Sequence, residues 1–258
     1  MIYRSLLSRL FVILLWLPLP ATALTVTLEG NVMAAGTHEV AEGTRINDLL
    51  ESAGVDDDAF FLGASWYRES AISAQQDLKN GLLFDLTVLE QSALIYNHKN
   101  LSQLAHRLKQ TLKQMPVTGR IQSTLDPAAV LGTPLNHKLE NNDRIVFPDR
   151  PSGILITGAT HHDCSLSFEP LETAPDYLKH CPTGTSSDKS WVYVIQPDGS
   201  TWKEGIGLWN STQYKSLAPG AIIYTPFNEN LMPDELIHIN DDMAAFLATQ
   251  VPFVNPEP

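Results

Sequence analysis

The sequence predicts an α+β protein of two related tandem domains, the first interrupted by a helical hairpin, with an amphipathic helix at the C-terminus. One observation is an internal repeat in which the pattern beginning at Leu24 recurs without gaps, so that Gly30 falls on Gly158, 128 positions later. Another is a second internal repeat, in which residues 139–148 match residues 217–226 at an offset of 78. The difference, 128 minus 78, places 50 extra residues inside the first copy. Repeats at so long a period indicate tandem domains and not a solenoid.

Residues 1–23 have the features of a secretory signal peptide, cut after Ala23. Two arginines precede an apolar run at residues 10–17, and small residues before the cut suit signal peptidase. Pro18 ends this run short of the roughly 20 apolar residues that a retained anchor needs. We therefore expect an exported protein whose mature chain does not insert into a membrane.

The mature chain is acidic. Removing Arg4 and Arg9 with the signal peptide leaves 15 basic residues against 29 acidic ones, a formal charge of −14. Such a surface repels phosphate backbones and anionic lipids, which argues against nucleic acid and membrane surfaces as partners.

The first domain is expected to span residues 24–150. Alternating strands at 24–28 and 37–40 are followed by a helix whose buried face begins at Ile46, and this order opens a β-grasp domain. After the insertion, residues 117–125 resume the sheet, Asp126 and Pro127 turn the chain, and residues 144–147 supply the closing strand.

The insertion is expected at about residues 68–116 as two helices. Leucines recur at intervals of three and four residues in two runs, from Ile72 to Leu89 and from Leu101 to Met115. Two such stripes would pair with each other, so we expect an antiparallel hairpin packed on the first domain. A docking surface for a partner protein is the alternative. In either case we expect the protein to fold after most of the insertion is deleted.

The second domain, residues 151–232, repeats the plan, and residues 233–258 form a C-terminal helix and tail. The expected elements are strands at 154–156, 166–168, 191–195 and 221–225, a short helix at 174–180, and a last helix at 241–249 capped by Asn240.

Two cysteines, Cys164 and Cys181, remain in the exported chain. An even count in an oxidising compartment predicts a disulfide, which would staple the short helix to the hairpin of the second domain. The competing interpretation makes them metal ligands together with His161, His162, Asp163 and His180. Their spacing does not match that of a structural zinc site, so we expect no metal.

Several motifs carry a family resemblance over essentially the whole mature chain. The glycines at 30, 36, 43 and 54, with Ile46, Asp48, Leu49 and Leu50, resemble the soluble-ligand-binding β-grasp (SLBB) pattern of outer-membrane polysaccharide export proteins. The order of parts more closely resembles the GfcC family of capsule biosynthesis proteins, with the motifs Thr118-Gly119-Arg120, Leu125-Asp126-Pro127, Arg150-Pro151, Pro197-Asp198-Gly199 and Trp209-Asn210.

The resemblance implies two SLBB-like β-grasp domains in a periplasmic protein for assembly or export of a surface polysaccharide. It also implies docking to export or assembly proteins, no assigned reaction, and a pocket-lining arginine at Arg120. That guanidinium would suit a carboxylate of an acidic polysaccharide or of a partner protein. The alternative for Arg120 is a structural ion pair with a nearby carboxylate such as Asp126.

A search for reactive groups finds no nucleophile elbow, zinc-protease motif, phosphate loop or dinucleotide fingerprint, so we predict no cofactor. Trp202, Trp209 and Tyr214 lie close in sequence and form either a sugar-stacking platform or part of the core. Two functions remain. The first is a non-catalytic accessory role in polysaccharide assembly or export. The alternative is a periplasmic carbohydrate-active enzyme, a hydrolase or ligase of the same polymer, whose acids the sequence does not single out.

Overall fold

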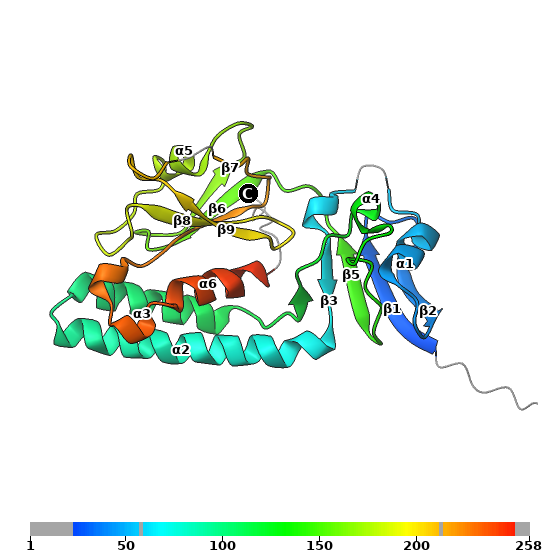
Figure 1. The fold of residues 1–258 in the computed structure, drawn as a ribbon, viewed down its shortest axis with the longest axis horizontal. Helices are drawn as coiled ribbons and strands as arrows, with labels where there is room; N and C mark the ends of the chain where they lie inside the picture. Colours follow the sequence, from blue (N-terminus) through cyan, green and yellow to red (C-terminus); the bar gives the residue numbers. More distant parts are fainter. Residues whose placement is uncertain (1–22, 57–58, 212–213, 251–258) are drawn as a thin grey trace, which may run out of the picture.

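The structure is a computed structural model that describes residues 23–56, 59–211 and 214–250 (Figure 1). The expected signal peptide, apart from Ala23, and the tail beyond residue 250 lie outside the described residues. Within the described chain, no helix combines the length and the apolar character needed to cross a membrane. The strands form two separate five-stranded sheets, which confirms the α+β class with two tandem domains.

The first sheet has the strand order β2-β1-β5-β3-β4. Strand β1 runs antiparallel to β2 and parallel to the central strand β5, and α1 shares an apolar core with β1 and β5. The elements are β1 (Ala23–Gly30), β2 (Gly36–Ala41), α1 (Ile46–Ala53), β3 (Ser65–Tyr67), β4 (Arg120–Ile121), α4 (Pro127–Val130) and β5 (Asp143–Phe147). The sequence does not predict β3, and the strand expected at 117–125 is only two residues long.

The second sheet repeats this topology in the order β7-β6-β10-β8-β9. Again the first strand pairs antiparallel with the second and parallel with the last. Its elements are β6 (Gly153–Gly158), β7 (Cys164–Ser167), α5 (Ala174–Leu178), β8 (Trp191–Ile195), β9 (Thr201–Gly205) and β10 (Ile222–Thr225). Short 3-10 turns occupy 61–63, 69–71, 229–231 and 234–236.

The internal repeat is visible at two glycines. A side chain at Gly30 would meet the carbonyl oxygen of Phe147 at 1.9 Å, and one at Gly158 would meet that of Thr225 at 2.3 Å. Both glycines have positive φ, +83° and +105°, a region that other residues rarely adopt. Gly30 and Gly158 are 128 positions apart, and the residues whose carbonyls they approach, Phe147 and Thr225, are 78 positions apart. The same close approach of two parallel strands therefore occurs once in each domain.

The expected disulfide is confirmed: Cys164 at the start of β7 is bonded to Cys181, just after α5. It closes the helix of the second domain onto its edge hairpin. The alternative metal site at these cysteines is wrong, because both sulfurs are already used.

The inserted hairpin consists of α2 (Ile72–Ile95) and α3 (Lys99–Gln114), which pack against each other as expected. However, the hairpin lies across the second sheet, beside the C-terminal helix α6 (Ile239–Ala248) (Figure 1). One core joins the three helices to the sheet, with Leu82, Leu86, Leu89, Leu108 and Leu112 from the hairpin, Tyr193, Ile195, Ile222 and Tyr224 from the sheet, and Met243, Phe246 and Leu247 from α6.

The expectation that the hairpin packs on the first domain is therefore wrong. The second sheet has two apolar faces, and α5 covers only the one that holds Val192 and Val194. The hairpin and α6 cover the other face. Because deleting the hairpin would expose that face to water, we no longer expect the insertion to be dispensable for folding.

Asn240 lies inside α6 and does not cap it. Its side chain accepts a hydrogen bond from the backbone N–H of Phe227 at 2.9 Å and donates to the carbonyl of the same residue at 3.0 Å. This buried amide fixes the start of α6 against the segment after β10, because it satisfies two backbone groups that water cannot reach.

Candidate functional site on the second domain

Arg120 is buried, with 4% of its surface exposed, where three parts of the chain meet. Its guanidinium donates to the carbonyl of Pro197 in the β8–β9 turn, to that of Gln250 at 2.8 Å and to that of Ala248 at 3.5 Å. Burial lowers the pKa of the guanidinium, and the electrostatic interactions with Tyr67 and Asp198 oppose this shift. The side chain therefore connects β4 to the second domain and to the end of α6.

Asp126 does not pair with Arg120; no ion pair among the described residues joins the two. Asp126 is the N-cap of α4, where its carboxylate accepts from the N–H of Ala128 at 2.9 Å. The structure thus separates the two residues that sequence reasoning grouped together.

The three expected stacking residues are also apart. Trp209 is 75% exposed, and its ring meets Trp191 edge-on with centroids 6.1 Å apart. Trp202 is half-buried, donates its indole N–H to Glu204 and lies below the ammonium group of Lys215. Tyr214 is half-buried, and no ring contact among the described residues joins it to either tryptophan.

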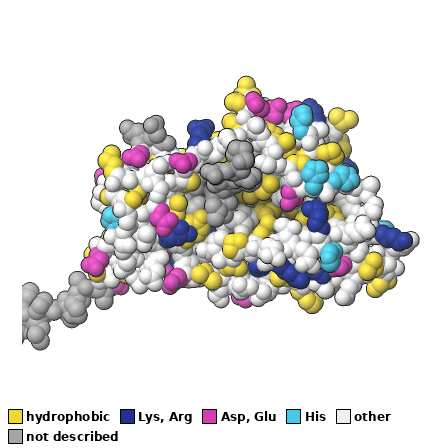
Figure 2. Space-filling model, turned by 180° about the vertical axis from the view of Figure 1, so that it is seen from behind, with side chains coloured by type: hydrophobic (Ala, Val, Ile, Leu, Met, Phe, Trp, Pro, Cys, Tyr) yellow, Lys and Arg dark blue, Asp and Glu magenta, His cyan; other side chains and the backbone are white. Residues whose placement is uncertain are grey.

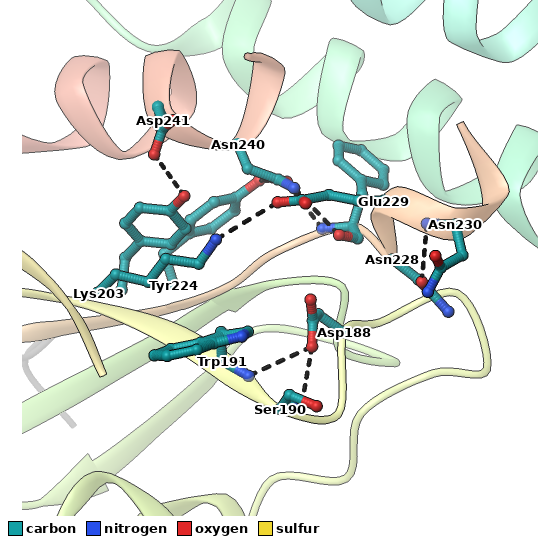
Figure 3. Close-up of polar contacts among 12 residues, drawn as sticks. Asp188, Ser190, Trp191, Lys203, Tyr224, Asn228, Glu229, Asn230, Asn240 and Asp241 are labelled. Atoms are coloured by element: carbon teal, nitrogen blue, oxygen red, sulfur yellow. Dashed lines mark hydrogen bonds and ion pairs between the residues drawn. The ribbon is translucent and has the colours of Figure 1, made fainter. Parts of the chain in front are cut away.

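Trp191, at the start of β8, lines a pocket of about 370 Å³. Figure 3 shows Trp191 and Asp188 on one side of it and Lys203 and Glu229 on the other. The Lys203 ammonium lies 5.6 Å from the centre of the Trp191 ring and 3.4 Å from a Glu229 oxygen. The remaining lining residues are Lys189, Ser190, Asn228 and Asn230.

The polar residues of this pocket are held in place by the backbone. One oxygen of Asp188 accepts from the N–H groups of Ser190 at 2.7 Å and Trp191 at 3.2 Å, which fixes the carboxylate beside the indole. Asn228 caps the turn at 229–231 by accepting from the N–H of Asn230. No partner is assigned, among the described residues, to the second Asp188 oxygen, to the Asn228 amide N–H₂ or to the Asn230 side chain.

This arrangement suits a ring that is apolar on its faces and polar at its rim. An indole offers a flat apolar surface, while carboxylate, amide and ammonium groups offer hydrogen-bond acceptors and donors around it. A cyclic sugar has this distribution of C–H faces and hydroxyl groups. The pocket thus offers an apolar ring surface with polar groups around it, and the charge of Lys203 is paired with that of Glu229.

Sequence reasoning missed Trp191 and its polar neighbours. The sequence places Trp191 only in a strand, at the start of a run whose other four residues are buried. The pairing of the strands is what brings these residues together. Because β8 and β10 are antiparallel, the start of β8 and the end of β10 lie at the same end of the sheet. Asp188 precedes β8 and Asn228 follows β10. That these two residues lie close together could be predicted only once the pairing of β8 with β10 was known.

A second electrostatic feature lies on the hairpin. α3 carries Lys99, Arg107, Lys109 and Lys113 and has no Asp or Glu, although the whole chain has a formal charge of −12. Figure 2 shows Lys and Arg side chains along the lower edge of the molecule, which the hairpin forms in Figure 1. Lys109 is paired with Glu90 of α2, and Arg107 lies 3.5 Å from Asp163.

Three side chains that could hold a metal ion converge between α2 and α6. They are Asp85, His238 and Asp242, whose ligand atoms all lie within 4.8 Å of one another. Burial raises the pKa of the Asp242 carboxyl; the nearby His238 lowers it, and the carboxylates of Asp85 and Asp241 raise it further.

Comparison with known proteins gives matches over most of the chain. The family models described as "Capsule biosynthesis GfcC, N-terminal" and "Capsule biosynthesis GfcC C-terminal" match residues 21–138 and 163–252. The chain is also 27% identical over 146 residues to the uncharacterized protein YjbG of Escherichia coli strain K12. That alignment covers 56% of this chain and 59% of the length of YjbG.

Proposed function

Because the chain belongs to the capsule biosynthesis GfcC family, we propose that it is a periplasmic accessory protein that acts without catalysis in the assembly or export of a surface polysaccharide. The disulfide supports an exported location, since such bonds persist in oxidising compartments. Export or assembly proteins for the polymer are the partners that this role requires.

The Trp191 pocket is the observation that carries the proposal. A sugar unit of the polymer would lie against the indole, while Asp188, Asn228 and Asn230 hydrogen-bond to its hydroxyl groups. Lys99 and Lys113 of α3, which form no ion pair among the described residues, support an acidic polymer, because they offer local positive charge on an acidic protein.

The first prediction tests this pocket. We expect Trp191→Ala to weaken binding of the mature protein to the surface polysaccharide of its own strain by about tenfold, or ~1.4 kcal/mol. An aromatic stacking contact is worth about 0.5–1.5 kcal/mol, so Trp191→Phe should keep part of the affinity. Isothermal titration calorimetry measures both.

Tyr96→Ala is the matched control, because Tyr96 is an aromatic residue at the hairpin tip with 69% of its surface exposed. It should bind like the unaltered protein. Equal affinity of Trp191→Ala and the unaltered protein would remove the pocket from the proposal. Chromatography of the polymer after incubation addresses the alternative function, because shortened or lengthened chains would favour the enzyme.

A further inference from the structure

The cluster of Asp85, His238 and Asp242 joins elements that are distant in sequence. Asp85 lies within α2, His238 directly precedes α6, and Asp242 follows one helical turn later. The Nε2 atom of His238 lies 3.2 Å from an Asp85 oxygen and 3.7 Å from an Asp242 oxygen. Asp85 has 16% of its side chain exposed, while His238 has 51%, so the cluster is anchored in the helix interface and open on one side.

One imidazole nitrogen cannot satisfy both carboxylates. Nε2 carries either a single proton, which can form one good hydrogen bond, or a lone pair, which both carboxylates repel. The shorter contact goes to Asp85, and the Asp242 oxygen is left beyond hydrogen-bonding distance. The neighbouring Asp241 adds charge, although its own carboxylate accepts from the Tyr193 hydroxyl at 2.5 Å. The cluster thus holds more negative charge than one histidine can balance.

We propose that Asp85, His238 and Asp242 bind a divalent transition-metal ion, with Zn²⁺ as the best-fitting example. Imidazole nitrogen and carboxylate oxygen are common zinc ligands, whereas calcium and magnesium prefer oxygen alone. His238 and Asp242 lie on one face of a helical turn, a spacing that brings two ligands to one ion. Three protein ligands leave room for water at the open side.

The ion would connect α2 of the inserted hairpin to α6. These two helices lie side by side over the second sheet and share its core (Figure 1). Because the ligands are brought together only by folding, an ion bound there stabilises the folded state. Its role is structural, independent of the polysaccharide pocket beside Trp191.

The second prediction concerns the mature protein after treatment with a chelator. We expect ZnCl₂ to bind with a stoichiometry of one per chain and to raise the midpoint of thermal unfolding, while MgCl₂ gives a much smaller shift. His238→Ala and Asp85→Asn should each lose at least tenfold in zinc affinity and most of the thermal shift. Calorimetry gives the affinity, and circular dichroism gives the unfolding midpoint.

His106→Ala provides a matched control. His106 is also a half-exposed histidine beside a carboxylate of α2, at 2.9 Å from Glu90, but that carboxylate is already paired with Lys109. Its zinc response should equal that of the unaltered protein. The proposal is overturned if the unaltered protein binds no zinc, or if His238→Ala binds it with undiminished affinity.

Discussion

Arg120 gives the residue-scale prediction. Its guanidinium donates to carbonyls of Pro197, Ala248 and Gln250, and a buried acceptor left without its donor costs about 1–3 kcal/mol. We therefore expect Arg120→Ala to lower the free energy of unfolding by about 3 kcal/mol in urea denaturation. Arg144→Ala is the control, because Arg144 is half-exposed and its ion pair with Glu29 should contribute less than about 1 kcal/mol.

The opposite outcome would have a clear meaning. If the free energy of unfolding of Arg120→Ala is within about 0.5 kcal/mol of that of the unaltered protein, and a deletion strain complemented with this variant loses its surface polysaccharide, Arg120 is a ligand residue.

The sequence could identify Arg120 as a cation at the start of a strand, but it could not identify its role. The acceptors of Arg120 lie more than 70 positions away, in a turn and at a helix end. Cys164 and Cys181 were predictable because their chemistry restricts them to each other.

At the scale of elements, two leucines of α2 test where the hairpin packs. Leu86 is fully buried in the core shared with the second sheet, whereas Leu94 is 60% exposed near the end of the same helix. We expect Leu86→Ala to lower the free energy of unfolding by about 2–5 kcal/mol. Leu94→Ala should change it by less than about 0.5 kcal/mol. Equal effects of the two substitutions would contradict the packing described for the hairpin.

Element types were predictable where the periodic pattern is long. The leucine stripes identified both hairpin helices, alternation identified β1, and the internal repeat identified β6. The three-residue β3 and two-residue β4 are too short to show a period. The sequence therefore did not predict β3, and it predicted too long a strand for β4. A usable signal was overlooked in β8 and β10: their runs are almost uninterruptedly apolar, which indicates strands buried on both faces. That signal predicts a second covering layer, which the hairpin supplies.

For the whole molecule, the hairpin makes the two domains interdependent. Residues 148–152 form the direct connection between the two sheets, but the hairpin of the first domain lies in the core of the second. We expect a protease site inserted between Asp149 and Arg150 to be cut without separating the halves. The two fragments should co-elute in size-exclusion chromatography, because an apolar interface holds them together.

The control for this experiment is the same cut in a chain that also carries Leu86→Ala and Arg120→Ala. Both substitutions weaken contacts between the halves, so this chain should release its fragments at a lower urea concentration. Separation of the unaltered halves without denaturant would show that the shared core does not hold the domains together.

The position of the hairpin also has a consequence for biogenesis. Synthesis from the N-terminus delivers residues 72–114 before residues 153–225, the second sheet that they cover. Until that sheet arrives, the leucines of the hairpin can pack only against each other, and a stretch of apolar surface faces water. A product truncated near residue 150 keeps this surface exposed and is a natural substrate for chaperones and proteases.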